Sequence, residues 1–79
     1  MHFYVYILLR SDGRRTYVGW TLDLGDRLAK HNAGLGAKFT RGQSWCLVYA
    51  ERYPTRSEAM SRESRLKRDR AFRALLRLS

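Results

Sequence analysis

The chain has one cysteine, one proline and only seven acidic residues among its 79 positions. A single cysteine, Cys46, excludes an internal disulfide framework and a cysteine-rich zinc site. Within WCLVYA we interpret it as a small apolar residue of a strand. No hydrophobic run approaches the length of a membrane span, and MHFYVYILLR lacks the basic leader and cleavage site of a signal peptide. We therefore expect a cytoplasmic protein.

Positive charge, in contrast, is abundant. The chain carries 16 Lys and Arg residues, which gives a formal net charge of +9. Self-repulsion of this size costs stability, so a polyanionic partner is expected. The basic residues are spread along the whole chain rather than confined to one amphipathic segment, which favours nucleic acid over a membrane. The length predicts one domain, residues 1–79, with a small core, and nothing in the sequence indicates a homodimer.

A β-hairpin is predicted at the N-terminus. The run FYVYILL, residues 3–9, is rich in aromatic and β-branched residues, and RTYVGW, residues 15–20, reads as the returning strand. Asp12 and Gly13 are the predicted central residues of a two-residue turn. One face then carries Val5, Ile7, Leu9, Val18 and Trp20 as core residues. The other face carries Tyr4, Tyr6, Tyr17 and Gly19, with Tyr6 opposite Gly19 and Leu8 opposite Tyr17.

A helix is predicted after the hairpin. Asp23 is its expected N-cap, and Asn32-Ala33-Gly34 ends it. Arg27 and His31, four residues apart, lie on one side of its apolar line. The following GLGAKFTRGQ, residues 34–43, is predicted to be a loop.

The C-terminal half predicts a third strand and one or two helices. WCLVYAERY, residues 45–53, is the strand, Pro54 ends it, and TRSE, residues 55–58, is a capping box that begins a helix. RAFRALLRLS, residues 70–79, is either a second basic amphipathic helix or a kinked continuation of the first. The order β-β-α-β-α-α predicts an α+β fold, a small three-stranded sheet with helices packed on it.

Glu63 stands within the apolar stripe of the expected long helix. Ala59, Met60 and Leu66 are three or four residues away and share its face. A carboxylate on a buried face is costly unless it meets a cation or a metal. Lys67, four residues further on, is one possible partner, and a bound metal is the other.

Taken singly, the remaining polar residues have ordinary explanations. Tyr6 and Tyr17 fit as strand tyrosines, Arg27 and His31 as a solvated helix face, and Gly19 as a bulge. Taken together with Glu63, they form an ordered set that these explanations do not account for.

This ordered set resembles the GIY-YIG nucleases. YVY at 4–6 is followed after ten residues by YVG at 17–19. Arg27, His31 and Glu63 then follow in the order that the family has. YVYIL, HNAGLGAKFTRG and SEAMSRESRLK further resemble the small stand-alone bacterial proteins of the UPF0213 group, and the resemblance covers nearly the whole chain.

The resemblance implies a metal-dependent endonuclease that hydrolyses phosphodiester bonds, with DNA favoured over RNA. Tyr6 and Tyr17 match the motif tyrosines, one of which activates or orients the attacking water; Tyr17 is preferred. Arg27 matches the arginine that contacts the scissile phosphate and, with the metal, would favour the phenolate. His31 matches a base or hydrogen-bond partner, and Glu63 matches the only metal-binding carboxylate, holding one Mg²⁺ or Mn²⁺ weakly. Nucleic-acid contacts are expected from Tyr4, Gly19, Lys30, Lys38, Arg41 and Lys67.

The sequence departs from the family pattern at three points. YVY at 4–6 replaces Gly-Ile-Tyr, Leu35 stands where relatives often have a basic residue, and no Asn follows Glu63. Lys67 and Asp69 are the polar candidates there. The alternative function is a nucleic-acid-binding module of the same fold with little or no turnover. A third interpretation, a basic ribosome-associated protein, leaves the ordered set unexplained.

Overall fold

Three strands form one antiparallel sheet in the computed structural model, which describes residues 1–36 and 38–77. The strands are β1 (Phe3–Arg10), β2 (Thr16–Thr21) and β3 (Trp45–Tyr53), and their order in the sheet is β2-β1-β3. The helices are α1 (Leu24–Asn32), α2 (Arg56–Arg68) and α3 (Arg70–Arg77), with a short 3-10 helix, η1, at Lys38–Thr40. The predicted α+β class and the order β-β-α-β-α-α are confirmed.

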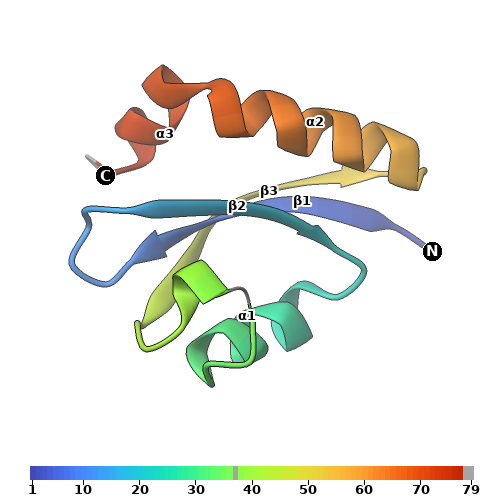
Figure 1. The fold of residues 1–79 in the computed structure, drawn as a ribbon. Helices are drawn as coiled ribbons and strands as arrows, with labels where there is room; N and C mark the ends of the chain where they lie inside the picture. Colours follow the sequence, from blue (N-terminus) through green and yellow to red (C-terminus); the bar gives the residue numbers. More distant parts are fainter. Residues whose placement is uncertain (37, 78–79) are drawn as a thin grey trace.

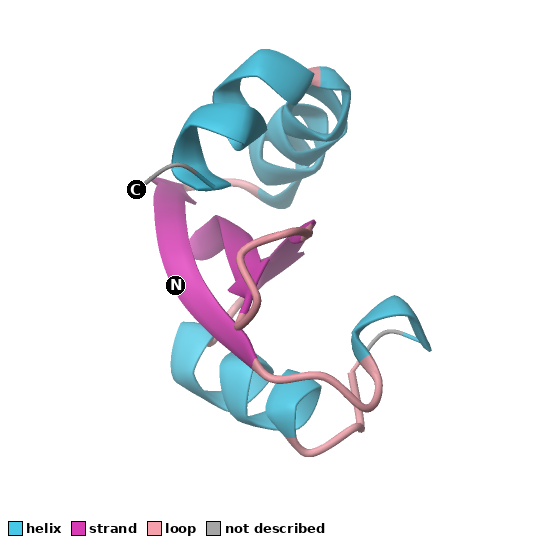
Figure 2. Ribbon diagram, turned by 90° about the vertical axis from the view of Figure 1, so that its left-hand side faces the viewer, coloured by secondary structure: helices cyan, strands magenta, loops and turns pink. Residues whose placement is uncertain are grey.

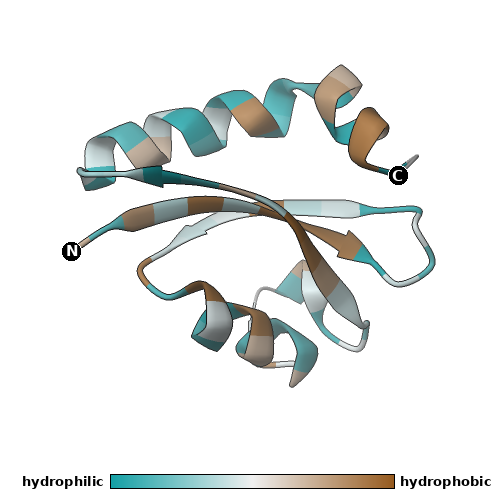
Figure 3. Cartoon of the chain, turned by 180° about the vertical axis from the view of Figure 1, so that it is seen from behind, coloured by the Kyte–Doolittle hydropathy of each residue, from teal (hydrophilic) through white to brown (hydrophobic). Residues whose placement is uncertain are grey.

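Helices cover both faces of the sheet. α2 and α3 lie over one face and α1 lies over the other (Figure 1), and the view turned by 90° shows the sheet between these two layers (Figure 2). The core below α2 contains Val5, Ile7, Val18, Ala59 and Leu66. The core above α1 contains Tyr6, Leu8 and Trp45. Four successive residues of the central strand β1 are therefore buried, and hydrophobic residues run along it while α2 is mostly hydrophilic (Figure 3).

The predicted register of the hairpin is confirmed. Tyr6 pairs with Gly19 and Leu8 pairs with Tyr17. Of the five residues predicted for the core face, Val5, Ile7 and Val18 are fully buried, whereas Leu9 and Trp20 are only partly covered. The pairing places both motif tyrosines on the face that carries α1.

The predicted two-residue turn is wrong. The Gly13 N–H donates to the Arg10 carbonyl at 2.7 Å, so Ser11 and Asp12 are the central residues. Gly13 follows with a φ of 75°, a conformation that glycine adopts without strain. Two interactions accompany this turn. Arg10 pairs with the Asp12 carboxylate at 2.6 Å, and the Ser11 N–H donates to the Ser44 carbonyl at 2.9 Å instead of to a carbonyl of the opposite hairpin strand.

The predicted caps begin the first two helices. The Asp23 carboxylate accepts from the Asp26 N–H at 2.9 Å at the start of α1. The Thr55 hydroxyl oxygen accepts from the Glu58 N–H at 3.2 Å at the start of α2. Each bond satisfies a backbone N–H that has no partner within its own helix.

The C-terminal segment forms a separate helix rather than a continuation of α2. Asp69 leaves helical geometry with a ψ of 78°, and its carboxylate accepts from the Phe72 N–H at 3.1 Å, which caps α3. Asp69, one of the two polar candidates to accompany Glu63, therefore caps α3 instead. Residues 78 and 79 of this segment, and residue 37 of the predicted loop, lie outside the described residues.

Cys46 lies in strand β3 as predicted, but its side chain is exposed because β3 is an edge strand with little cover at this end. Among the described helices, none has the length and apolar content needed to span a membrane.

Candidate functional site

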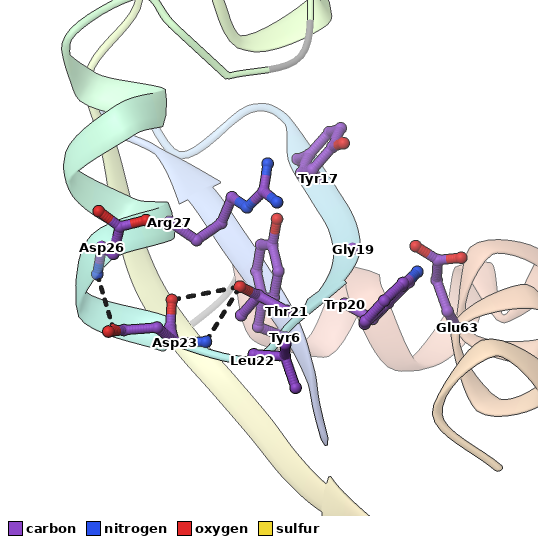
Figure 4. A pocket seen from close by; sticks show the side chains of 10 residues that line it. All are labelled: Tyr6, Tyr17, Gly19, Trp20, Thr21, Leu22, Asp23, Asp26, Arg27 and Glu63. Atoms are coloured by element: carbon purple, nitrogen blue, oxygen red, sulfur yellow. Dashed lines mark hydrogen bonds between the residues drawn. The ribbon is translucent and has the colours of Figure 1, made fainter. Parts of the chain in front are cut away.

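A cleft with a volume of about 420 Å³ opens beside the edge strand β2. Its lining comes from β1, β2, the turn into α1, α1 itself and α2: Tyr6, Tyr17, Gly19, Trp20, Thr21, Leu22, Asp23, Asp26, Arg27 and Glu63 (Figure 4). Four of the five predicted catalytic residues, Tyr6, Tyr17, Arg27 and Glu63, thus meet around one space. The fifth, His31, lies behind Tyr6 and does not line the cleft.

The cleft extends over the edge of the sheet. Successive side chains of a strand point to opposite faces, so Tyr17 and Gly19 face the α1 side and Trp20 faces the α2 side. Figure 4 shows Arg27 reaching towards the two tyrosines, and Glu63 on the other side of Trp20. An edge strand permits this arrangement because no further strand separates the two helical layers there.

Gly19 gives Tyr6 its position. A Cβ atom at residue 19 would lie 2.5 Å from the Tyr6 hydroxyl oxygen and 2.7 Å from its Cζ. It would also lie 3.2 Å from Cε2 of Tyr17. Both distances to Tyr6 are shorter than packed side-chain atoms allow, so the Tyr6 ring can lie here only with glycine at residue 19.

A buried hydrogen-bonded chain begins at Tyr6. Its hydroxyl lies 2.9 Å from Nε2 of His31, and His31 Nδ1 lies 2.6 Å from the Thr40 hydroxyl. The Thr40 carbonyl accepts from the Trp45 indole N–H at 3.0 Å, which fixes Thr40 in turn. His31 is only 1% exposed. Burial first, and then the charge of Arg27, lower the pKa of His31. A neutral imidazole that accepts from Tyr6 and donates from Nδ1 to Thr40 satisfies both bonds.

Burial also has the largest effect on the pKa of each of the two tyrosines. It raises the pKa of Tyr6, with smaller upward contributions from the charges of Tyr17 and Glu63, and the charge of Arg27 lowers it. Burial and the charge of Glu63 raise the pKa of Tyr17, again opposed by Arg27. Arg27 therefore favours the phenolate, as expected, but burial outweighs it and the protein by itself holds both side chains as phenols.

Glu63 is the least engaged carboxylate of the cleft. Asp23 caps α1, and Asp26 pairs with Lys30 at 3.1 Å. Glu63 has Lys67 at 3.9 Å, a long contact to an exposed lysine, and its own side chain is 19% exposed. The structure is thus compatible with both interpretations of Glu63 from the sequence. Glu63 faces the cleft, where a metal could bind, and Lys67 is near enough for a long ion pair.

A weakly held divalent cation fits this donor set. No group of three or more potential metal ligands occurs among the described residues. One hard carboxylate oxygen matches a Mg²⁺ ion that keeps several waters and takes its remaining ligands from a phosphate.

The orientation of Glu63 depends on its neighbour Arg62. Arg62 donates to the Glu51 carboxylate of β3 at 2.8 and 3.0 Å, and Tyr49 and Tyr53 also donate to Glu51. Burial acts to raise the pKa of Glu51, but these hydrogen bonds outweigh it and hold the pKa at about 2. The network fixes α2 on the sheet with Arg62 turned towards β3, and Glu63 faces the cleft.

Five of the six predicted nucleic-acid contacts lie outside the cleft. Tyr4 is partly buried in β1, whereas Lys30, Lys38, Arg41 and Lys67 are exposed on α1, at η1 and on α2. Gly19 does line the cleft. Contacts from the five outlying residues stay a prediction.

Thr40 and Trp20 are two of the site residues that sequence reasoning missed; Thr21, Leu22, Asp23 and Asp26 also line the cleft. Thr40 is nine residues from His31 across an irregular loop, so no helical or strand periodicity connects them. Trp20 was predicted as a core residue, and it does pack against the core below α2 while its other side lines the cleft.

Comparison with known proteins gives concordant matches. The model of the GIY-YIG catalytic domain matches residues 2–74. A UPF0213 protein of Halobacterium salinarum is 48% identical over 68 residues, covering 85% of this chain and 86% of that protein. A UPF0213 protein of Streptococcus pneumoniae serotype 4 is 47% identical over 66 residues, covering 82% and 66%. The solution NMR structure of a UPF0213 protein from Bacillus halodurans is 43% identical in sequence and matches with a TM-score of 0.51. The match covers 86% of this chain and 72% of that protein.

Proposed function

Because the chain belongs to the GIY-YIG family, with UPF0213 proteins among its relatives, we propose that it is a metal-assisted endonuclease that hydrolyses phosphodiester bonds of nucleic acid, DNA in preference to RNA. The family supports nuclease-type activity. The single observation that carries the proposal is the meeting of Tyr6, Tyr17, Arg27 and Glu63 around one cleft.

Arg27 binds the scissile phosphate. Its guanidinium offers a planar pair of donors that matches two phosphate oxygens. A phosphodiester is already an anion and gains further negative charge on its oxygens as water attacks, so a cation in the cleft stabilises the transition state more than the ground state. The net charge of +9 raises the local concentration of the polyanionic substrate.

Tyr17 acts on the attacking water. Its side chain is only partly buried and lines the cleft, whereas the hydroxyl of Tyr6 is already engaged by His31. Tyr17 as the phenolate takes a proton from water, and its own proton has left earlier to solvent. The oxygen of that water forms the new bond to phosphorus, the bond from phosphorus to the leaving sugar oxygen breaks, and the leaving oxygen takes a proton from solvent.

Tyr6 and His31 are positioning residues in this scheme. Tyr6 donates to His31, His31 is held by Thr40, and the Tyr6 ring lies beside Tyr17 at a centroid separation of 6.4 Å. A rigid, buried chain of this kind limits the motion of Tyr17 and keeps its hydroxyl in reach of the phosphate.

Glu63 would hold a divalent cation, Mg²⁺ or Mn²⁺. Such a cation would supply Lewis-acid chemistry, which would polarise the phosphate and stabilise the leaving oxygen. Glu63 also raises the pKa of Tyr17 through its negative charge. A cation paired with Glu63 would offset this upward contribution to the pKa of Tyr17, so a larger fraction of Tyr17 would be present as the phenolate.

A nucleic-acid-binding module with little turnover is the second candidate. One observation favours it: burial raises the pKa of both tyrosines, and a phenol that stays protonated is a poor base. The two candidates share the cleft and the basic surface and differ in turnover alone.

The test is incubation with duplex, branched and single-stranded substrates, with and without Mg²⁺ or Mn²⁺. The proposal expects metal-dependent nicking by the wild-type protein and by Arg65→Gln, an exposed control on α2 with the same change of charge. Arg27→Gln is expected to bind and not to cleave. Binding by all three proteins without cleavage under any metal condition would establish the binding module instead.

A further inference from the structure

A second pocket, with a volume of about 500 Å³, lies at the hairpin end of β2. Its lining comes from the hairpin, η1 and α3: Arg10, Arg14, Arg15, Thr16, Phe39, Arg73 and Arg77. We call it the arginine pocket. Five of its seven lining residues are arginines and none is acidic, so an anion is the ligand that its charge matches.

Arg73 gives the pocket a fixed wall. Its guanidinium donates to the carbonyls of Leu66 at 3.2 Å and Lys67 at 2.7 Å, and to the Thr16 hydroxyl at 3.3 Å. These bonds join α3 to the end of α2 and to β2. The pocket therefore lies between elements that are connected to one another and not on a loose C-terminal helix.

The remaining arginines differ in their partners. Arg10 is engaged by the Asp12 carboxylate, to which its Nε donates at 3.0 Å and its Nη2 at 2.6 Å. Arg14, Arg15 and Arg77 are exposed, and within residues 1–36 and 38–77 no carboxylate forms an ion pair with any of them. Like charges gathered in one pocket repel each other, and a bound polyanion reverses that cost.

Phe39 connects the arginine pocket to the cleft. It lines the arginine pocket, is 54% exposed, and stacks on Tyr17 of the cleft with a ring separation of 6.2 Å and an interplanar angle of 23°. Thr16 and Tyr17 are consecutive in β2 and line one pocket each. The two pockets therefore adjoin each other along β2.

We infer that the arginine pocket binds backbone phosphates of the same nucleic-acid strand whose scissile phosphate lies in the cleft, with a base stacked on Phe39 between them. The inference rests on the proposed function and adds the path of the strand along β2. Arginine forks match phosphate oxygens, and an exposed aromatic ring between two phosphate positions is the usual support for an unpaired base.

The test measures affinity for single-stranded oligonucleotides of increasing length, without metal, so that no cleavage is needed. The wild-type protein is compared with Arg14→Gln/Arg77→Gln and with the matched control Arg65→Gln/Arg68→Gln, whose residues are exposed on α2 and line neither pocket. Wild type and control are expected to bind more tightly as the strand lengthens enough to reach both pockets. The pocket variant is expected to lose that gain, about ten-fold or more.

Salt dependence gives a second readout. Each single-strand phosphate that is neutralised contributes about 0.7 to the slope of log affinity against log salt. Loss of two phosphate contacts therefore reduces the slope by about 1.4. Equal length dependence and equal slopes in the pocket variant and the control would overturn the inference.

Two further arms separate the alternatives. Phe39→Leu is expected to weaken binding of long strands about five-fold or more at an unchanged melting temperature. Inorganic phosphate is expected to compete only weakly, and competition as strong as that of the long oligonucleotide would show a free-phosphate site and contradict the strand path. A protein that shows the length effect without ever cleaving would contradict the proposed endonuclease alone.

Discussion

Replacing Gly19 with alanine is expected to displace Tyr6 and disrupt the cleft without touching any group that reacts. The new Cβ would lie 2.5 Å from the Tyr6 hydroxyl oxygen, 2.7 Å from Cζ and 3.2 Å from Cε2 of Tyr17. Tyr6 is 3% exposed and belongs to the central strand, so its ring has little room to retreat. The displacement also pulls the hydroxyl away from Nε2 of His31.

The magnitude follows from two opposing effects. Overpacking a core costs about 1–3 kcal/mol, and a buried hydrogen bond left without its partner costs about 1–3 kcal/mol more when the site does not relax. Reduced freedom of the unfolded chain returns about 0.4–1 kcal/mol. A net loss of about 3 kcal/mol is expected, which lowers the melting temperature of a chain of this size by roughly 12–24 °C.

Gly25→Ala is the matched control. Gly25 lies in α1, and a Cβ there would meet only the Asp23 carboxylate at 3.6 Å, an ordinary contact. Alanine is the better helix former by about 0.5–1 kcal/mol, so this variant is expected to melt at or above the wild-type temperature. Thermal melts and cleavage of one substrate are measured for all three proteins. If Gly19→Ala melts like wild type and cleaves normally, the close approach of Tyr6 to Gly19 is refuted.

The remaining predictions concern the tyrosines and the buried histidine. Tyr17→Phe is expected to fold normally and lose most cleavage, whereas Tyr6→Phe loses less activity but some stability; equal, unimpaired cleavage by both would make them purely structural strand residues. Thr40→Val is expected to destabilise the fold by about 1–3 kcal/mol, because Nδ1 of His31 loses its partner in a buried position; an unchanged melting temperature would count against the chain from Tyr6 to Thr40. Because the pKa of His31 is lowered from its ordinary value of 6.5, the unfolded chain binds a proton that the folded chain does not, so stability is fully present above pH 6.5 and falls as the pH drops below it. His31→Asn is expected to remove that dependence. Glu51 causes a separate loss of stability, which begins near its ordinary pKa of 4.5 and extends to about 2. Thermal melts of both proteins from about pH 7 to about pH 2 distinguish the two effects.

Most of the fold could be predicted from short sequence patterns, because each of these patterns is compatible with one local structure only. Alternating hydrophobic residues fixed the hairpin register, since a slip by one residue would turn Tyr6 and Val5 to the wrong faces. Asp23 and Thr55 begin helices because their side chains satisfy free backbone N–H groups. The prediction of the turn was wrong because Arg10 pairs with Asp12 there and the Ser11 N–H donates to the Ser44 carbonyl, and no rule for two-residue turns includes such contacts.

The candidate site was predicted as a set of residues but not as an arrangement. The sequence predicts Tyr6, Tyr17, Arg27 and Glu63 as a set, but their place around one cleft depends on how α1 and α2 pack on opposite faces of the sheet (Figure 1). The pairing of Glu51 with Arg62 and the contact of Thr40 with His31 join distant segments, so no sequence period reveals them. Burial likewise decides the pKa of both tyrosines, and burial is a property of the packed molecule.

The most direct test of the central claim is Mg²⁺-dependent cleavage by wild type and Glu63→Gln, read beside thermal melts of both. Glutamine keeps the shape of Glu63 and removes the charge that attracts the cation. The account predicts that cleavage falls by orders of magnitude, while metal-free nucleic-acid binding holds or tightens because one negative charge leaves the cleft. Stability is expected to hold or rise, since the contact with the exposed Lys67 is long and such surface pairs contribute less than about 1 kcal/mol. A variant that melts clearly lower than wild type and cleaves at the wild-type rate with Mg²⁺ would contradict the metal-binding role of Glu63.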